Sequence, residues 1–252
     1  MTGIYCFQTV EEMAETMCHE FCNHVSALSR VQQRIGIAFS GGNTPKVFFK
    51  HLAASQKISG ELLNWNTIHI FWVDERCVPP DHPDSNYGMT LKHLLQEINI
   101  PDSNIHRIWG ENNPVREAGR YSEELLRFVV QENGIPVFDW IFLGMGSDGH
   151  TASIFPDRLD LMNSVNICEA VKHPSSGQNR ITLTGRTIMN ANRITFMVTG
   201  KSKSKVIRQI LEGKPEAEKF PAGLIKQSGG KPEYYFDGEA AIHITSTCHG
   251  KH

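Results

Sequence analysis

Short apolar runs alternate with longer amphipathic stretches along most of this chain, and that alternation limits the fold more than any other feature. Each short run is typical of a buried strand, and each amphipathic stretch carries apolar residues at steps of three and four, as a helix does. The predicted strands are residues 35–39, 67–73, 139–143, 193–199 and 232–236. Strands that alternate with helices form a parallel sheet with helices on both faces. We therefore expect an α/β fold with a mostly parallel central sheet.

Capping signals mark where the first helices begin. Thr9 and Glu12 form a capping box. The apolar face of this helix consists of Val10, Ala14, Met17, Phe21, Val25 and Leu28. Thr44 followed by Pro45 predicts a second helix, capped by Thr44, that runs to about residue 54. Further helices are expected over residues 87–97, 114–132 and about 202–212. Because no linker or internal repeat interrupts this order, we expect one domain over residues 1–252.

Composition excludes several classes of protein. With 40% hydrophobic and 21% charged residues among 252, the chain has the profile of an ordinary globular protein. Its net charge of −2 offers no overall positive field for nucleic acid, so an anionic ligand needs a local site. The N-terminus lacks the features of a secretory signal, and no apolar run is long enough to predict a membrane span. Six cysteines are too few for a disulfide scaffold, so we expect a cytoplasmic protein. We expect no membrane partner and no required oligomer, and the sequence does not give the oligomeric state.

Polar motifs directly follow four of the predicted strand regions. They are residues 40–44, 74–76, 144–150 and 200–203. In an open parallel sheet, ligands bind in the crevice beyond the carboxyl ends of the strands. Four motifs in four separate turns would therefore meet there and form one site. The alternative is that these turns are polar only because turns lie at the surface.

The first of these turns has the features of a phosphate site. It consists of Ser40, Gly41, Gly42, Asn43 and Thr44. The two glycines permit positive φ and close approach of a ligand, and the helix that follows directs free N–H groups and its positive dipole end into the turn. The segment matches neither a Walker A loop nor a dinucleotide fingerprint, so no nucleotide cofactor is expected. The alternative is a tight strand-to-helix turn without a ligand.

Cationic side chains could complete an anion site at these strand ends. Lys203 lies at the start of a predicted helix, and Arg76 ends the second motif. Arg180 precedes the strand-like residues 181–184. The sequence does not rank these three side chains as phosphate ligands, and each could instead be a solvated surface cation.

The third motif carries the candidate for proton transfer. His150 lies in a loop with three glycines, which can place an imidazole against a ligand without crowding it. Histidine titrates near pH ~6.5 and suits general-base work, and a carboxylate such as Asp148 or Asp74 could fix its tautomer. The alternative is that His150 only caps the following turn. The motif of Asp74, Glu75 and Arg76 could be a proton-transfer group, a structural ion pair, or both.

A metal site is not expected. Cys18 and Cys22 are four residues apart on the first predicted helix, but no second pair at zinc-ligand spacing accompanies them. Because Cys18 flanks the apolar face, it is better explained as a small core residue. The tail over residues 248–252, with Cys248 and a terminal histidine, is better explained as a frayed end.

Five stretches of the chain together resemble the glucosamine-6-phosphate isomerase/6-phosphogluconolactonase family. They are Ser40-Gly-Gly-Asn-Thr-Pro45, Trp72-Val-Asp-Glu-Arg76, Asp84-Ser-Asn-Tyr87, Leu143-Gly-Met-Gly-Ser-Asp-Gly-His-Thr-Ala-Ser-Ile-Phe-Pro156 and Arg180-Ile-Thr-Leu-Thr184. The resemblance covers nearly the whole chain in order, and the loop over 143–156 is its most specific part. Two departures are Asn43, where Ser is more usual, and residues 173–179, which replace a segment richer in proline and lysine.

The resemblance implies a Rossmann-like three-layer αβα fold, no metal or nucleotide cofactor, and hydrolysis of 6-phosphoglucono-δ-lactone to 6-phosphogluconate in the oxidative pentose phosphate pathway. The deaminases of the family continue differently after the Asp-Gly-His step and carry Tyr where this chain has Arg76, so the lactonases are favoured. The implied site binds phosphate on residues 40–44, with Lys203, Arg180 and Arg76 as cations, while His150 activates water. A glucosamine-6-phosphate deaminase and a sugar-phosphate sensor without turnover are the alternatives.

Overall fold

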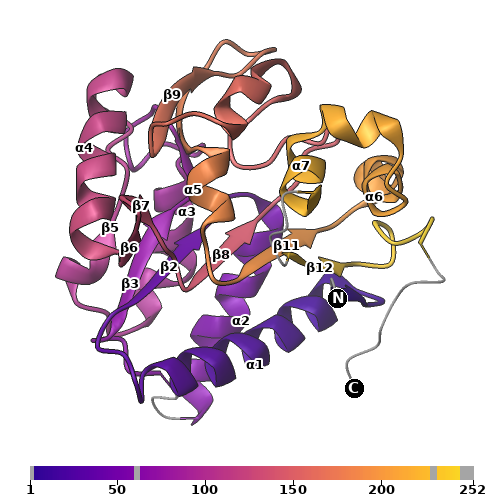
Figure 1. Cartoon of the computed structure of the whole chain (residues 1–252). Helices are drawn as coiled ribbons and strands as arrows, with labels where there is room; N and C mark the ends of the chain where they lie inside the picture. The colour runs from indigo at the N-terminus through magenta and orange to yellow at the C-terminus, as the bar shows by residue number, and fades with distance from the viewer. Residues whose placement is uncertain (1–2, 60–62, 228–231, 245–252) are drawn as a thin grey trace.

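A seven-stranded sheet forms the centre of the protein (Figure 1). The structure, a computed structural model, describes residues 3–59, 63–227 and 232–244. The strand order is β1-β12-β11-β8-β2-β3-β5, and every neighbouring pair is parallel. The strands are β1 Ile4–Cys6, β2 Ile35–Phe39, β3 Ile68–Trp72, β5 Ile105–His106, β8 Trp140–Leu143, β11 Ile194–Val198 and β12 Pro232–Phe236. The expected parallel sheet is confirmed, and it is parallel throughout.

The strand order contains a topological switch point between β2 and β8. From β2 the chain adds β3 and then β5 on one side, and it later adds β8, β11 and β12 on the other. Connections that leave in opposite directions open a crevice beyond the carboxyl ends of the two central strands. Residues 40–44 follow β2 and residues 144–150 follow β8, so the two motifs flank this crevice.

Helices cover both faces of the sheet. They are α1 Val10–Leu28, α2 Asn43–Ser59, α3 Asn86–His93, α4 Pro114–Phe128, α5 Gly185–Met189, α6 Ser204–Leu211 and α7 Pro221–Gln227, with 3-10 helices at Leu95–Glu97, Asp102–Asn104, Pro156–Met162, Lys201–Lys203 and Pro215–Lys219. In Figure 1, α1 and α2 lie together on one face, and α5 and α7 lie on the other. The three-layer αβα architecture is therefore confirmed.

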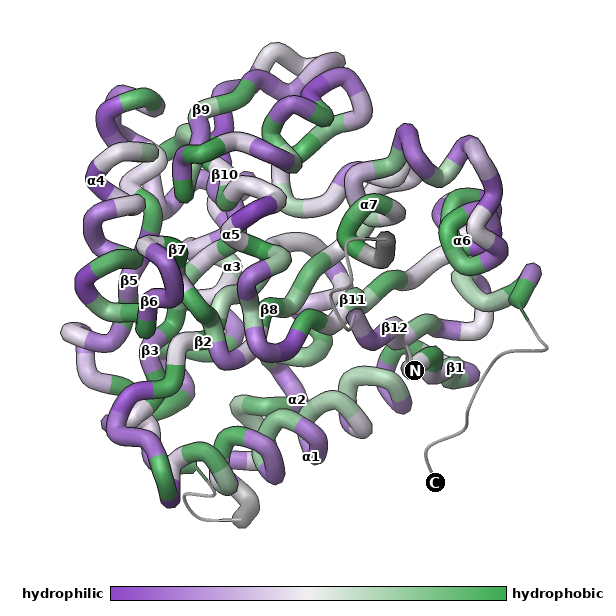
Figure 2. The backbone as a smooth tube through the Cα atoms, viewed as in Figure 1, coloured by the Kyte–Doolittle hydropathy of each residue, from purple (hydrophilic) through white to green (hydrophobic). Residues whose placement is uncertain are grey.

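Aromatic side chains join the layers. Phe142 of β8 is fully buried, and Phe21 of α1 and Phe48 of α2 pack on it with ring centroids 5.9 and 5.6 Å away. On the opposite face of the sheet, Phe128 of α4 packs on His106 at 4.4 Å. Each buried phenylalanine contributes roughly 1.5–3 kcal/mol. Figure 2 shows the hydrophobic colour along β8 and β11, at the centre of these contacts.

A second, antiparallel sheet begins next to the carboxyl end of β3. Its order is β4-β10-β9, with β4 Asp74–Arg76, β10 Asn179–Leu183 and β9 Cys168–Lys172. The second polar motif, residues 74–76, forms β4, which was not among the predicted strands. Its pairing with β10 places Arg180 directly opposite Arg76.

The start of α2 differs from the expected one. The helix begins at Asn43, because Gly42 with φ 106° takes the position before it and its carbonyl accepts a hydrogen bond from the N–H of Lys46. Thr44 does not cap the helix, since its hydroxyl bonds to that of Thr199 at 2.7 Å. Pro45 is accordingly the third residue of the helix and not the first.

Three other expected helices end or begin elsewhere. The helix expected over 114–132 ends at Phe128, because Asn133 and Gly134 have positive φ and form the two-residue turn of a hairpin, β6 Gln131–Glu132 and β7 Ile135–Pro136. The helix expected over 87–97 stops at His93, since Leu94 leaves the helical region with φ −137°. The helix expected over 202–212 starts as a 3-10 turn and becomes α6 at Ser204.

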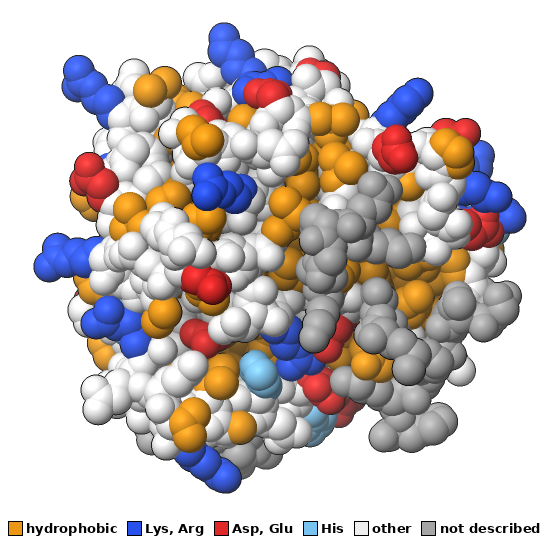
Figure 3. All heavy atoms as spheres, viewed as in Figure 1, with side chains coloured by type: hydrophobic (Ala, Val, Ile, Leu, Met, Phe, Trp, Pro, Cys, Tyr) orange, Lys and Arg blue, Asp and Glu red, His pale blue; other side chains and the backbone are white. Residues whose placement is uncertain are grey.

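The surface and the cysteines complete the description of the fold. Figure 3 shows cationic and acidic side chains interspersed on one face of the molecule. Among the described residues, no helix combines the length and the apolar character that crossing a bilayer requires. Cys18 and Cys22 are buried in the hydrophobic core, which confirms the interpretation of Cys18 as a core residue. The tail over 248–252 lies outside the described residues.

Candidate active site

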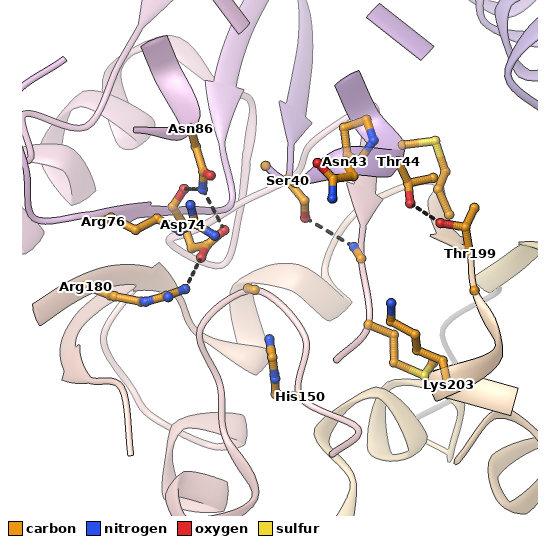
Figure 4. A pocket seen from close by; sticks show the side chains of 18 residues that line it. Ser40, Asn43, Thr44, Asp74, Arg76, Asn86, His150, Arg180, Thr199 and Lys203 are labelled. Carbon is orange, nitrogen blue, oxygen red and sulfur yellow. Dashed lines mark hydrogen bonds and ion pairs between the residues drawn. The ribbon is translucent and has the colours of Figure 1, made fainter. Parts of the chain in front are cut away.

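A cavity of about 410 Å³ lies beyond the carboxyl ends of the central strands (Figure 4). This volume is in the range of small-molecule sites. Residues from all four polar motifs line it, together with one arginine of the second sheet: Ser40, Gly41, Gly42, Asn43, Thr44, Asp74, Arg76, His150, Arg180 and Lys203. Asp148 is the one candidate residue outside this lining, and it contacts His150. The structure thus brings the candidate residues into one place.

The turn after β2 is held close to the neighbouring loops. Ser40 is buried, and its hydroxyl accepts a hydrogen bond from the N–H of Gly144 at 3.3 Å, which links the two loops across the switch point. A Cβ on Gly41 would lie 1.7 Å from Oδ1 of Asn86, so only glycine allows this approach. Gly42, with φ 106°, turns the chain into α2. Gly41 is therefore required by the close approach of the Asn86 side chain, and Gly42 by its positive φ.

One side of the cavity is suited to an anion. The first N–H groups of α2, at Asn43 and Thr44, have no carbonyl partner one turn earlier in the helix, and they carry its positive dipole end. Lys203 comes from the 3-10 turn after β11. Figure 4 shows Asn43, Thr44 and Lys203 on the same side of the cavity. This arrangement matches the helix N-terminus plus cation that binds phosphate groups.

His150 pairs with Asp148 in the glycine-rich loop. Nδ1 of His150 lies 2.6 Å from Oδ1 of Asp148, and the imidazole packs on the ring of Phe155. Burial favours a higher pKa for Asp148, but the hydrogen bonds and charge of His150 outweigh it and lower the pKa. An ionised carboxylate can only accept, so Nδ1 carries the proton, and in the neutral imidazole Nε2 then holds the lone pair. A Cβ on Gly146 would lie 2.2 Å from Nδ1, so this loop needs glycine there.

Asp74 is fixed by three partners. Ser153 donates its hydroxyl to Oδ2 at 2.6 Å, and the Asn86 amide donates to Oδ1 at 3.3 Å and to the backbone carbonyl at 2.9 Å. Nη1 of Arg180 lies 3.9 Å from Oδ2. Of the two carboxylates considered for His150, Asp148 makes the contact, while Asp74 is tied to Arg180.

Glu75 has a structural place in the second motif. It is buried, and its carboxylate accepts the backbone N–H groups of Arg76, Asn86 and Tyr87 at 2.7–2.8 Å and the hydroxyl of Ser85 at 3.1 Å. Burial raises the pKa of Glu75 to about 7, although these backbone hydrogen bonds oppose the rise. Glu75 therefore fixes the start of α3, from which Asn86 reaches the cavity.

Arg76 and Arg180 form a second cationic group. Nη1 of Arg76 donates to the carbonyl of Asp84 at 2.7 Å, and the Arg180 side chain is only 12% exposed. Burial lowers the pKa of Arg180, Asp74 opposes this, and the charge of Arg76 adds to it. Figure 4 shows the two arginines on the side of the cavity away from Lys203, with His150 between the two groups.

Several lining residues were not among the sequence candidates. They are Pro45, Asn86, Gly144, Met145, Ala152, Met197, Thr199 and Gly200. Thr199 ends a predicted strand, so the rule that ligands bind at strand ends could have found it. Asn86 gave no comparable signal, because its position depends on Glu75. Within the described ranges, no group of three or more His, Cys, Asp or Glu side chains is placed to hold a metal ion.

Comparison with known proteins agrees with this fold. The family model described as glucosamine-6-phosphate isomerases/6-phosphogluconolactonase matches residues 8–233. A 6-phosphogluconolactonase of Haemophilus influenzae is 43% identical over 238 residues, which cover 94% of this chain and 97% of that protein. A 6-phosphogluconolactonase of Aggregatibacter actinomycetemcomitans is 41% identical over 235 residues, covering 93% and 97%.

A solved structure extends the likeness to three dimensions. The crystal structure of a devB protein superposes with a TM-score of 0.86 at 39% identity, covering 97% of this chain and 100% of that one. The chain belongs to the glucosamine-6-phosphate isomerase/6-phosphogluconolactonase family.

Proposed function

We propose that the chain hydrolyses 6-phosphoglucono-δ-lactone to 6-phosphogluconate, and that the 410 Å³ cavity is the active site. One observation carries this proposal: a single cavity combines a helix N-terminus with a lysine, a histidine–aspartate pair, and two arginines at the far side. These three parts suit the phosphate, the lactone carbonyl and the carboxylate that ring opening produces. A cytoplasmic location, a single domain and independence from an oligomer stay predictions.

The phosphate binds at the turn of residues 40–44. Free N–H groups at the start of α2 and the ammonium of Lys203 are donors of the kind that hold phosphate oxygens. The hydrogen bond between Thr44 and Thr199 supports the geometry of this end by joining α2 to the end of β11. Of the three cations that the sequence left unranked, Lys203 is the phosphate ligand in this proposal, because it is on the side of the turn.

His150 acts as the general base. With Nδ1–H directed to Asp148, Nε2 takes a proton from a water molecule while the water oxygen attacks the lactone carbonyl. The tetrahedral intermediate then collapses, the bond between the carbonyl carbon and the ring oxygen breaks, and the proton passes to that oxygen. A positioned base contributes ~10²–10⁴-fold in rate. A lactone already hydrolyses slowly in water, so this contribution, with charge stabilisation, is enough without a covalent nucleophile.

Arg76 and Arg180 stabilise the negative charge that develops at the carbonyl oxygen, and they then face the carboxylate that forms when the product acid releases its remaining proton to solvent. Guanidinium groups suit planar oxyanions because they donate in a fork. Asp74 orients Arg180 and balances part of the charge, which is a positioning role. The alternative for Asp74, direct proton transfer to the substrate, is the role that a deaminase would need.

The decisive experiment is hydrolysis of fresh 6-phosphogluconolactone, followed by pH-stat or coupled assay with the unphosphorylated lactone as control. We expect fast turnover of the phosphorylated lactone only. Ammonia release from glucosamine 6-phosphate would support the deaminase, and binding of sugar phosphates without turnover would support a sensor. Arg76 favours the lactonase, since a second guanidinium serves an oxyanion better than it serves proton shuttling.

A further inference from the structure

The two arginines of the cavity stand in an unusual arrangement. β4 and β10 are antiparallel, and Arg76 and Arg180 are directly opposite each other in their register. Like charges in this position repel and destabilise a sheet. Asp74 lies 3.9 Å from Arg180, and the charges of Asp84 and Glu75 also act on Arg180, so the repulsion between the two arginines is partly offset.

Each guanidinium also keeps a donor free. Nε of Arg76 and Nε of Arg180 are buried and have no hydrogen-bond partner. A buried donor without a partner costs about 1–3 kcal/mol, and more when it is charged. Both side chains line the cavity, where an oxyanion would face two guanidinium groups.

Uncharged acceptor groups contact both guanidinium groups: a glutamine amide oxygen contacts Arg180, and a backbone carbonyl contacts Arg76. Oε1 of Gln178 accepts a hydrogen bond from Nη2 of Arg180 at 3.3 Å, while its Nε2 donates to Oδ2 of Asp84 at 3.1 Å. The backbone carbonyl of Asp84 accepts from Nη1 of Arg76 at 2.7 Å. Gln178 therefore closes a chain of contacts from Arg180 through Asp84 to Arg76.

We propose that Gln178 is a positioning residue that keeps Arg180 directed into the cavity through an uncharged contact, so that the arginine pair reserves its charge for the carboxylate of the ring-opened product. This inference rests on the proposed function. A glutamate at position 178 would instead pair with Arg180 and repel Asp84, and an aliphatic side chain would leave Arg180 without its outer acceptor. Gln178 thus sets how strongly the site distinguishes a carboxylate from a neutral end group.

The test compares two ligands by calorimetry. 6-Phosphogluconate carries a phosphate and a carboxylate, and sorbitol 6-phosphate carries the same phosphate with an alcohol in place of the carboxylate. We expect the wild-type protein to bind 6-phosphogluconate more tightly. Gln178→Glu should reduce the ratio of the two affinities on the order of tenfold, through 6-phosphogluconate alone. Gln178→Met adds no charge and should reduce the affinity ratio less. This variant provides the test if Gln178→Glu does not fold.

The matched control is Ser175→Glu, which puts the same charge on an exposed position of the same segment. It should leave the affinity ratio unchanged. A wild-type ratio that persists in both Gln178 variants would overturn the positioning role, and so would equal weakening of both ligands, which indicates a structural effect. Failure of the wild-type protein to bind either ligand would contradict the proposed function itself, so the two failures are distinguishable.

Discussion

Oδ1 of Asp148 lies 2.6 Å from Nδ1 of His150, in a loop where the missing side chain of Gly146 makes room for the imidazole. The contact has a chemical consequence because a carboxylate can only accept. It holds the imidazole in the tautomer whose Nε2 can take a proton. The loop therefore places an oriented imidazole in the crevice at the switch point.

Asp148→Asn removes this control of the tautomer. The amide can donate to Nδ1, which stabilises the form that carries its proton on Nε2. We expect kcat to fall ~10–100-fold, less than the ~10²–10⁴-fold contribution of a general base, while KM changes little. The fall stays moderate because Asp148 is 47% exposed and water can replace part of the contact. Steady-state kinetics check this, with Asp157→Asn as the exposed control; an unchanged kcat would contradict the role of Asp148.

Gly146→Ala tests the space around the imidazole. The new Cβ would lie 2.2 Å from Nδ1 of His150 and 2.4 Å from Oδ1 of Asp148, so the pair must move. We expect a loss of kcat on the order of 10²-fold, since misplaced catalytic groups cost about that much. Gly119→Ala is the matched control, because a Cβ there meets nothing within 4 Å. Gly119→Ala should keep full activity. Its free energy of unfolding should rise by roughly 0.5–1 kcal/mol, because alanine favours the helical conformation of α4 more than glycine does. Equal activity of the two variants would argue against the loop geometry.

Lys203→Ala tests the phosphate end. Loss of a charged donor to a phosphate costs about 1.5–3 kcal/mol, so we expect KM for the phosphorylated lactone to rise on the order of 10–100-fold with kcat largely kept. Lys201→Ala, in the same 3-10 turn and exposed, is the control and should change KM little. Initial rates over a range of substrate concentrations measure both. A KM for Lys203→Ala equal to that of the control would remove this lysine from the site.

His69 makes stability depend on pH. It is 7% exposed, and its Nδ1 lies 2.9 Å from Nε2 of His106. Burial, with the charges of His106 and Arg34, lowers the pKa of His69 to about 4. Between pH ~6.5 and 4, this histidine therefore binds a proton in the unfolded chain but not in the folded one. The free energy of unfolding is highest above pH ~6.5, and it decreases as the pH falls toward 4.

Urea unfolding at pH 7 and pH 5 checks this linkage. The free energy of unfolding of the wild-type protein should drop by about 2 kcal/mol more than that of His69→Gln over this interval, because every other group titrates in both proteins. His19→Gln, at an exposed position of α1, should follow the wild type. If the free energy of unfolding changed equally in the wild type and in His69→Gln between pH 7 and pH 5, the lowered pKa of His69 would be contradicted.

The parts of the site that follow their own strands could be predicted from sequence. Residues 40–44 and 144–150 come directly after β2 and β8, and a parallel sheet brings all carboxyl ends to one edge. The strand β2 matched its expected bounds for the same reason, since a short apolar run between polar turns is a local signal. The Asn133-Gly134 turn was also a local signal, and the expectation of a longer α4 overlooked it.

The rest depends on contacts between distant segments. β1 and β5 have three and two residues, too few for a periodic pattern. The pairing of β4 with β10 sets Arg180 opposite Arg76, and neither strand contains a signal for the other. For this reason the sequence could identify the two arginines as candidate cations of the site, but it could not show that they lie apart from Lys203.

The most direct test of the account is turnover of fresh 6-phosphogluconolactone by the wild-type protein and by His150→Ala, with spontaneous hydrolysis subtracted. The expected result is fast wild-type turnover and a fall in kcat of ~10²–10⁴-fold in the variant, with the affinity for 6-phosphogluconate nearly unchanged. Near wild-type turnover by His150→Ala would show that the imidazole is not the base and would contradict the account.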